Sequence, residues 1–377
     1  ALLVVSVFVA NPTLPCPTVN QEFLEGGPTF PGGIFPFVFI CIMCGAVSGF
    51  HALVSSGTTP KMIDKESHVR MIGYGAMLME GLVGIVALIA AASMDPKLYY
   101  EINVSQDTRT LEKWQPRIDR LVAELDSGDL PHLPVERRDL GRVEELVGGE
   151  SLRGRTGGAV TLAVGMSFIL TDSLKWALDP KTIEGLLKYW YHFAIMFEAL
   201  FILTTIDAGT RIARFLLQEA MGRVHPKLGR TDWMPGAAFA TAVVTAGWGI
   251  LVYTGSIDTI WPMFGIANQL LAVLALALVT TLLVNTGRGR YAPVTLLPML
   301  FVVSTTLTAG VQLVGWSFPA MYATGQPLKA TLCIVLTVFV MVSVGTLLLM
   351  AASRWVAVAG GLVPGRGDKI EEKELAP

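Results

Sequence analysis

The chain has 377 residues, of which 52% are hydrophobic and only 15% are charged. Charged residues normally make up about a quarter of a soluble domain, so this composition favours a membrane protein. The net charge of −2 points neither to a nucleic-acid surface nor to a strongly basic membrane face. Several apolar runs approach the roughly 20 residues that cross a hydrocarbon core, and the alternating segments of about ten residues that build a transmembrane barrel are absent. We therefore predict an all-α, polytopic transmembrane helix bundle.

The sequence shows no pattern typical of a soluble enzyme. It has no P-loop, GxGxxG, HExxH or GxSxG motif, so we predict neither an enzyme nor a bound cofactor. Cys41 and Cys44 have CxxC spacing, which could suggest metal or redox chemistry. Because this pair lies within an apolar run and has no second pair, we expect both cysteines to be small, buried packing residues.

The first 33 residues predict an incomplete helix followed by a loop. Residues 1–10 are apolar but too few to span a membrane, and they lack both an initiator Met and the charged start of a signal peptide. We expect them to be the end of a helix whose N-terminal part is missing. Residues 11–33 contain five prolines and predict an aqueous or interfacial loop.

Seven apolar runs then predict transmembrane helices, the third of which continues as a helix to about Leu217. In chain order, the predicted spans are residues 35–56, 71–92, 190–208, 237–253, 260–284, 294–316 and 330–352. The tail over residues 360–377 is short and charged, and we expect it to be disordered.

A charged insertion separates the second and third spans. Residues 95–156 hold many of the charges, and residues 108–125 predict an amphipathic helix that Pro116 should kink or restart. We predict an extramembranous segment and assign it no role. The apolar run over residues 157–170 is short, about 14 residues, which favours a re-entrant or interfacial segment over a span.

The distribution of basic residues predicts the orientation. Loops after the third, fifth and last spans carry basic residues, whereas the turns after the fourth and sixth spans hold Lys329 as their only basic residue. The basic sides, including the tail, are therefore predicted to be cytoplasmic. The basic link at 61–70 joins that side only if residues 157–170 do not cross, and the insertion is then external. The predicted transmembrane bundle consists of residues 1–94 and 157–359.

Residues 45–61 form the stretch on which the functional prediction depends. Small, hydroxylic and helix-weakening residues gather there at mid-membrane depth. Because lipid supplies no hydrogen bonds, a helix that loosens there must line a protein cavity. A broken helix of this kind is a candidate transport site; the alternative is a Gly/Ser-rich packing face followed by an ordinary turn. The predicted orientation places Lys61 at the interface and moves the expected break to residues 48–51.

The candidate substrate-binding residues lie in this stretch and in a second weakened segment. Asn268 and Gln269 follow a run that contains Pro262 and Gly265, and their amides could contact substrate or bond neighbouring helices. His51 could titrate in a useful pH range. The full set is Ser48, Gly49, Phe50, His51, Ser55, Ser56, Thr58, Thr59, Asn268 and Gln269.

Polar residues of the third span are candidates for holding a coupling ion or proton, since such groups are expensive in lipid. Thr204, Thr205 and Asp207 offer hard oxygen ligands that suit Na⁺ or a proton relay. The alternative is an interfacial Asp beside Thr hydroxyls that bond to their own helix.

Three further ionisable residues fall at membrane depth. His192 and Glu198 are roughly 120° apart around an ideal helix and therefore face different directions. Glu80 could carry a proton or form a buried salt bridge. We count all three as candidate coupling residues.

Long motifs are spread over most of the chain, from residue 35 to about residue 284. They include GAVSGFHALVSSGTTPK at 45–61 and WPMFGIANQLLA at 261–272. The complete set covers residues 35–38, 45–61, 70–80, 157–165, 190–211 and 261–272. In these motifs the chain closely resembles the carbon starvation protein family, CstA.

The resemblance implies a secondary transporter of the bacterial inner membrane, linked to uptake of peptides and pyruvate during nutrient limitation. It also implies a LeuT-like core of two five-helix inverted repeats with broken first helices. Residues 1–10 would end the first repeat, residues 35–56 would be the broken first helix of the second repeat, and two extra C-terminal helices would follow. Family members are longer, so the missing N-terminal part would hold the other broken helix.

We therefore predict a secondary active transporter that imports a small carboxylate such as pyruvate, or peptides, by alternating access coupled to H⁺ or Na⁺. The alternative is a non-transporting membrane subunit or sensor that couples nutrient state to a partner protein. The predicted partners are the small-molecule substrate, the lipid bilayer and a missing N-terminal half or companion chain, with no nucleic acid. The predicted location is the bacterial cytoplasmic membrane, with a cytoplasmic C-terminus.

Overall fold

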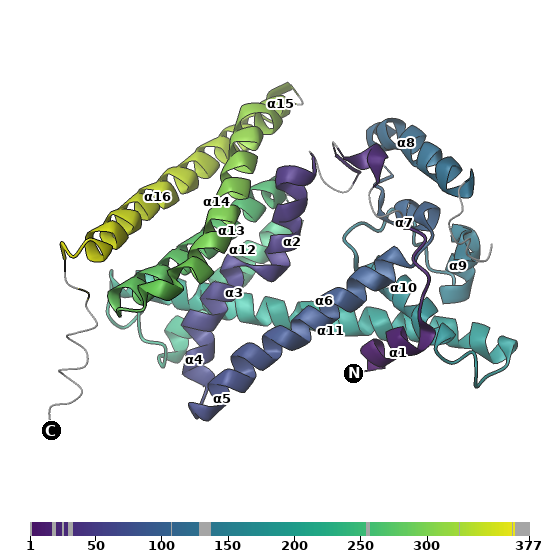
Figure 1. The fold of residues 1–377 in the computed structure, drawn as a ribbon, viewed down its shortest axis with the longest axis horizontal. Coiled ribbons are helices and arrows are strands. Elements are labelled where there is room, and N and C mark those ends of the chain that lie inside the picture. The colour runs from purple at the N-terminus through teal and green to yellow at the C-terminus, as the bar shows by residue number, and fades with distance from the viewer. Residues whose placement is uncertain are drawn as a thin grey trace. The chain divides into compact units, whose positions relative to one another are not determined.

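All regular structure in the described part of the chain is helical (Figure 1). The computed structural model describes residues 2–16, 20–24, 26–28, 33–106, 108–127, 137–253, 257–323, 325–363 and 365. Its α-helices are α1 (Leu2–Ala10), α2 (Phe39–Ala46), α3 (Gly49–Leu53), α4 (Thr59–Met62), α5 (Ser67–Arg70), α6 (Ala76–Ala92), α7 (Pro96–Asn103), α8 (Thr108–Ser127), α9 (Leu140–Val147), α10 (Ala159–Asp172), α11 (Pro180–Gly222), α12 (Met234–Tyr253), α13 (Ile257–Asn285), α14 (Ala292–Gln312), α15 (Phe318–Ala323) and α16 (Pro327–Ala359).

Within the described residues, six helical stretches are long and apolar enough to cross a membrane. They are Ile34–Met62, Ser67–Ala92, Lys181–Gly222, Phe264–Asn285, Gly289–Ala323 and Pro327–Ala359. Six of the seven predicted spans lie in these stretches, which confirms an all-α, multi-pass membrane protein. The remaining predicted span forms α12, whose described apolar part, Met234–Ile250, is shorter than the roughly 20 residues of a full crossing.

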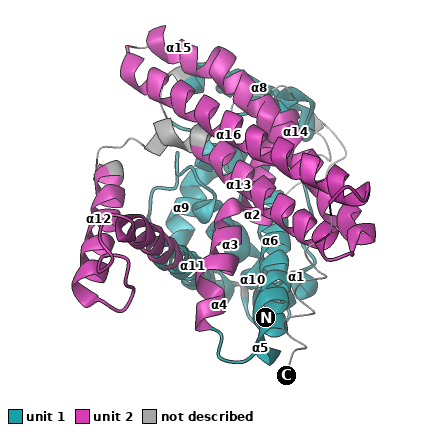
Figure 2. Cartoon of the chain, turned by 90° about the vertical axis from the view of Figure 1, so that its left-hand side faces the viewer, with its two compact units in different colours: residues 1–33, 63–207 teal, residues 34–62, 208–377 magenta. Residues whose placement is uncertain are grey.

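The chain divides into two compact units, coloured separately in Figure 2, and each is described by itself. Unit 1 comprises Ala1–Gly33 and Ile63–Asp207. Its central helix is α10, which packs on α6, α1 and α7. At the crossing with α6, a Cβ on Gly165 would lie 2.4 Å from the carbonyl oxygen of Ala90. The two backbones therefore approach closely because residue 165 has no side chain.

The predicted short helix at 157–170 is α10, which has 14 residues. At 1.5 Å per residue it is about 21 Å long, well short of a 30 Å hydrocarbon core. Its length agrees with the prediction, and its re-entrant path stays a prediction. Nearly all its side chains from Thr161 to Thr171 are buried, so α10 is the core of unit 1 rather than a lipid-facing helix.

The insertion folds into α7, α8 and α9 within unit 1. The predicted amphipathic helix is confirmed as α8, which buries Trp114 and Ile118 against Val104. It continues through Pro116, so the predicted restart does not occur. Pro116 is exposed, and water can therefore bond the backbone carbonyl that a proline leaves unpaired.

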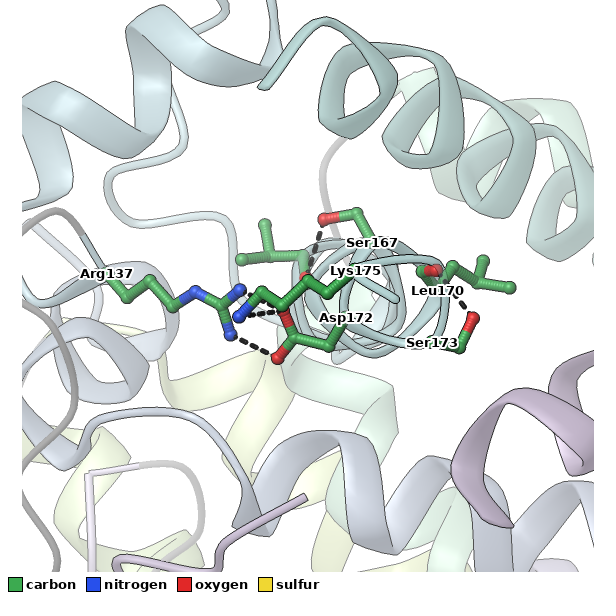
Figure 3. Close-up of polar contacts among 7 residues, drawn as sticks. Arg137, Ser167, Leu170, Asp172, Ser173 and Lys175 are labelled. Carbon is green, nitrogen blue, oxygen red and sulfur yellow. Dashed lines mark hydrogen bonds and ion pairs between the residues drawn. The ribbon is translucent and has the colours of Figure 1, made fainter. Parts of the chain in front are cut away.

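A partly buried ion cluster joins the insertion to the end of α10 (Figure 3). The Arg137 guanidinium donates to both carboxylate oxygens of Asp172, at 2.8 Å to Oδ2, and the Lys175 ammonium lies 2.7 Å from Oδ1. Burial alone would raise the pKa of Asp172, but the hydrogen bonds and charges of Arg137 and Lys175 outweigh it and hold this pKa below its usual value.

The neighbouring Arg138 connects the ends of two insertion helices. Its Nε lies 2.9 Å from the carboxylate of Asp95, which caps α7, and its Nη2 bonds Asp126 near the end of α8. A further polar contact is buried between α7 and α10, where Asn103 Nδ2 donates to Thr161 Oγ1 at 2.7 Å. Directional polar contacts therefore fix the insertion in unit 1.

Unit 2 comprises Ile34–Met62 and Ala208–Pro377. Its central helix is α13, which packs against α14, α16, α3 and α2. The core between them is apolar and includes Met43, Ile266, Leu270, Val273 and Val302. Helix α13 therefore supports α2 and α3, the two helices formed by the stretch on which the functional prediction depends.

We predict that Asp172→Asn lowers the free energy of unfolding of the purified protein by about 2 kcal/mol at pH 7, the size expected for hydrogen bonds to charged groups. Thermal unfolding followed by circular dichroism in detergent measures the change. Glu145→Gln is the control, because Glu145 forms an exposed pair with Arg142 on α9; its effect should be much smaller.

The same variant has a defined pH dependence. A carboxylate with a depressed folded-state pKa contributes stability above the unfolded pKa of about 3.9, and that contribution is lost as the pH falls through the folded pKa. The stability difference between the native protein and Asp172→Asn should therefore shrink below about pH 4. A difference that is constant down to the acid limit would contradict this role of the ion cluster.

Candidate functional site

The membrane helix that begins in Ile34–Val38 is broken between α2 and α3 (Figure 1). Helix α2 ends at Ala46, Val47 has φ −135° and ψ 70°, and Ser48 is extended with φ −96° and ψ 136°. Ser48 occupies the N-cap position of α3, which serine favours, but its hydroxyl makes no capping hydrogen bond to α3. The break therefore lies at residues 47–48, and it overlaps the predicted range of 48–51 only at Ser48.

The amide of Asn268, from α13, fills the break. Its Oδ1 accepts hydrogen bonds from the backbone N–H of Phe50 at 2.9 Å and from Ser48 Oγ at 3.1 Å. The N–H groups at the start of a helix have no partner within that helix, so Asn268 caps α3 from another part of the chain. Both Ser48 and Asn268 are buried. Of the two roles expected for Asn268, the structure shows the bond to a neighbouring helix, and contact with substrate stays a prediction.

Gly49 lies where α3 touches α13. A Cβ on this residue would be 2.3 Å from Leu271 Cβ and 2.4 Å from the carbonyl oxygen of Asn268. Real Cβ atoms do not approach other heavy atoms so closely, so only glycine fits this crossing. The close approach also brings the Asn268 amide within reach of Phe50.

Gln269 is fully buried beside the same break. Its Nε2 donates weakly to the carbonyl oxygen of Ile40 at 3.4 Å. Its Oε1 has no hydrogen-bond partner among the described residues. A buried acceptor without a donor costs free energy. This oxygen is therefore an unsatisfied polar group at the contact between α13 and α2.

The hydroxyls beyond the break bond to their own helix. Ser55 and Ser56 both donate to the carbonyl oxygen of Ala52, and Thr58 donates to that of Val54. These bonds surround a π-helical turn at Val54–Thr58. Each hydroxyl oxygen still has lone pairs, so the three side chains can accept from a ligand but have no proton left to donate.

The remaining predicted residues of this stretch differ in exposure. His51 is exposed, and its ring lies edge-on to that of Phe50 at 5.8 Å. Thr59 is half-buried and Thr58 is buried. The substrate-binding role of the stretch therefore stays a prediction, whereas the helix break is a feature of the structure.

Lys61, which we expected at the membrane interface, makes a contact that sequence reasoning missed. The Lys61 ammonium lies 4.8 Å from the ring centre of Phe215, and the Arg214 guanidinium lies over the same ring at 4.7 Å. A Cβ on Gly209 would touch the Phe50 ring at 3.4 Å. The C-terminal part of α11 therefore touches α3 and α4 within unit 2. The signal was available in part, because Arg214 and Phe215 are adjacent to each other, but their partner is about 150 residues away.

The predicted coupling residues lie on α6 and on the part of α11 that belongs to unit 1. Thr204 Oγ1 donates to the carbonyl oxygen of Phe201 at 2.7 Å, and Thr205 Oγ1 to the same oxygen at 3.3 Å. Hydroxyls bonded to their own helix are one of the two expected arrangements. Asp207 is exposed in this chain. The three residues are neighbours on α11, and their role in coupling stays a prediction.

The other three ionisable candidates are separate from one another along unit 1. Glu80 is exposed on α6, whereas His192 and Glu198 are half-buried on α11. The ring of His192 lies edge-on to Tyr191 at 5.4 Å. Among the described residues, no group of three or more His, Cys, Asp and Glu side chains could hold a metal ion.

The two cysteines of α2 are free thiols, and one of them differs from the prediction. Cys44 is half-buried, and its Sγ lies 3.5 Å from Asn268 Nδ2. Cys41 is exposed in this chain, so the prediction that it is a buried packing residue is wrong. Of the two side chains, Cys44 is the one that contacts Asn268 of α13.

Comparison with known proteins shows one family. The family model described as "Carbon starvation protein CstA" matches residues 1–309. The peptide transporter CstA of Escherichia coli is 44% identical over 317 residues, covering 82% of this chain and 44% of the relative. The peptide transporter CstA of Bacillus subtilis is 43% identical, with 82% of this chain and 47% of the relative covered. The pyruvate/proton symporter BtsT of Escherichia coli is 39% identical, with 82% and 45% covered.

The chain therefore spans less than half the length of these curated relatives. No solved structure matches it.

We predict that Gly49→Ala destabilises the protein by about 1–3 kcal/mol, because overpacking forces α3 and α13 apart. Thermal unfolding in detergent measures the change. Gly57→Ala is the matched control on the same helical stretch, since a Cβ there meets no atom within 4 Å. This control should be neutral or stabilising by up to about 1 kcal/mol, as for other helical glycines. Equal effects of the two variants would contradict the close crossing.

Proposed function

Because the chain belongs to the carbon starvation protein CstA family, we propose that it is part of a secondary active transporter that imports a small carboxylate such as pyruvate, or peptides. Transport would proceed by alternating access coupled to H⁺ or Na⁺. The names of the relatives, a peptide transporter and a pyruvate/proton symporter, support this choice. In the proposed arrangement, the chain holds the second repeat of a LeuT-like core and two further C-terminal helices, in the bacterial inner membrane with a cytoplasmic C-terminus.

The observation that carries the proposal is the break at 47–48, sealed by Asn268. A helix freed from its own hydrogen bonds at membrane depth is stable only where protein or an aqueous cavity satisfies it. Here the partner is a single amide oxygen, which accepts from Phe50 N–H and Ser48 Oγ. These two donors suit one oxygen of a carboxylate equally well, because the start of a helix favours negative charge.

We therefore place the substrate carboxylate at the N–H of Phe50 and the hydroxyl of Ser48, with the Asn268 side chain turned aside. The remaining polar groups of the stretch, His51, Ser55 and Ser56, would contact the rest of the substrate. Exchange of one acceptor for another costs little, because each buried donor keeps a hydrogen bond. A seal of this kind suits a site that must open and close repeatedly.

For coupling, we propose Asp207 as the proton carrier or, with Thr204 and Thr205, as a Na⁺ ligand. The hydroxyl oxygens of the two threonines can coordinate a cation, since their protons are donated to the backbone of their own helix. Glu80, Glu198 and His192 are the further candidates. All are costly in lipid and therefore belong to an interior surface of the assembled transporter.

We propose that a further polypeptide segment, the N-terminal half or a companion chain, covers α6 and α11. In an apolar 18-residue part of each helix, 11% of the residues are buried for Ser67–Ala92 and 6% for Lys181–Gly222. The corresponding share for Phe264–Asn285 is 44%. The sparsely covered helices carry Glu80 and Asp207. Lipid is a poor neighbour for carboxylates, so protein is the better cover for these faces.

We predict that Ser48→Ala raises the KM for pyruvate by about ten- to a hundredfold, because the variant loses one hydrogen bond to a charged group. Uptake of labelled pyruvate into vesicles containing the assembled protein measures the effect. Ser343→Ala is the matched control, because the Ser343 hydroxyl bonds the carbonyl oxygen of Phe339 in its own helix, α16. An unchanged KM in Ser48→Ala would overturn the placement of the carboxylate.

A second prediction concerns coupling. In vesicles with an imposed pH gradient or Na⁺ gradient, Asp207→Asn should abolish the stimulation of uptake by one of these gradients, because the amide carries no titratable charge. Exchange of internal for external substrate should continue. Asp232→Asn is the control, since Asp232 is exposed and paired with Arg230. A normal response to both gradients would remove Asp207 from the coupling site.

A further inference from the structure

The insertion holds a cavity that is separate from the broken helix. It has a volume of about 760 Å³ and lies between α7, α8 and the segment around α9. All its lining residues belong to unit 1, whereas the helix break belongs to unit 2. Ligand pockets in proteins commonly have volumes of roughly 300–1,000 Å³, so this cavity is large enough for a small organic ligand.

One wall of the cavity is a face of α8 on which acidic and apolar side chains alternate. Asp119 and Asp126 lie on this face, and Ile118 forms part of the buried floor together with Leu111 and Val122. Residues 111, 115, 118, 122 and 126 recur at spacings of three and four, which places them along one side of a helix. The wall therefore offers negative charge above an apolar strip.

The wall opposite α8 carries both basic and acidic side chains. Lys97 and Glu101 come from α7, one turn apart, and Arg153 comes from the segment after α9. Burial raises the pKa of Glu101, and the charges of Lys97 and Arg153 oppose this rise. Two cations therefore lie near the half-buried Glu101, and the carboxylates of Asp139 and Asp95 add negative charge on the same side.

The charged groups of the cavity divide into engaged and available ones. Arg138 and Asp126 are bonded to each other, and Asp139 caps α9 through the N–H of Arg142 at 2.8 Å. Among the described residues, Lys97 and Arg153 form no ion pair.

The available acid is Asp119 on α8. Its carboxylate accepts one hydrogen bond, from the Gln115 amide at 2.9 Å, and keeps its remaining lone pairs for a ligand. Together with Lys97 and Arg153, Asp119 completes a cavity with available groups of opposite charge on opposite walls.

We propose that this cavity binds a short zwitterionic peptide. The C-terminal carboxylate lies at Lys97 and Arg153, the N-terminal ammonium lies at Asp119, and apolar side chains rest on Leu111, Ile118 and Val122. A ligand with a single charge satisfies one wall and leaves the other unpaired. The inference deepens the proposed function by giving the insertion a capture role for one of the two substrate classes, at a site other than the broken helix.

Isothermal titration calorimetry of the purified chain in detergent tests the proposal with trialanine as the probe. Trialanine should bind with saturation. Its N-acetylated form and its C-terminal amide should each bind roughly tenfold more weakly, since each lacks one charge-assisted hydrogen-bonding group. Equal binding of the three peptides, or no binding of trialanine, would overturn the proposal.

Variants assign the two ends of the peptide. Arg153→Ala should weaken binding of trialanine and leave that of its C-terminal amide unchanged, and Asp119→Asn should do the same for the N-acetylated form. Arg142→Ala and Glu145→Gln, an exposed pair on α9 outside the cavity, should change neither. Arg153→Lys should restore part of the affinity, which separates loss of charge from loss of folding.

The test also separates this inference from the transporter proposal. Trialanine binding that is insensitive to Arg153→Ala and Asp119→Asn would overturn the inference, whatever the uptake measurements show. Normal binding to the cavity, in an assembled protein that transports neither pyruvate nor peptides, would overturn the proposed function and leave the inference standing.

Discussion

At the broken helix of unit 2, backbone N–H groups need a hydrogen-bond acceptor from another part of the chain. A helix that stops at Ala46 and starts again at Gly49 leaves N–H groups that lipid cannot satisfy. Asn268 supplies the acceptor for Phe50 N–H, but it can do so only because Gly49 allows α13 to approach the backbone of α3. The packing of α13 against α14 and α16 then holds this acceptor in place.

Both units contain a close helix crossing at a glycine, but the contacts around the two crossings differ. In unit 1, Gly165 brings α10 against the backbone of α6, and the surrounding contacts are mainly apolar, with the ion cluster at Asp172 and the Asn103–Thr161 hydrogen bond beside them. In unit 2, Gly49 brings α13 against α3, but the contact between the helices contains two amides and a hydroxyl. Close helix crossings occur in both units, and the crossing in the second unit also contains buried polar groups.

Much of this arrangement could be predicted from the sequence, because apolar runs and small residues act locally. Run length predicted seven spans, six of which lie in long apolar helices, and it predicted the short α10. The Gly/Ser-rich stretch predicted a break over residues 48–51, and the observed break lies at 47–48. The partner of the break could not be predicted. Asn268 lies 220 residues from Ser48, and an amide in an apolar run is equally compatible with substrate contact and helix contact. The cavity of the insertion was also missed, since its opposite charges come from helices whose pairing only the fold determines.

The central claim is that the sealed break is the position of the substrate carboxylate. A structure of the assembled transporter with bound pyruvate, determined by electron cryomicroscopy, tests it most directly. We predict a carboxylate oxygen within hydrogen-bonding distance of Phe50 N and Ser48 Oγ, with the Asn268 side chain displaced. Pyruvate bound elsewhere, with the hydrogen bonds from Phe50 and Ser48 to Asn268 unchanged, would contradict the account.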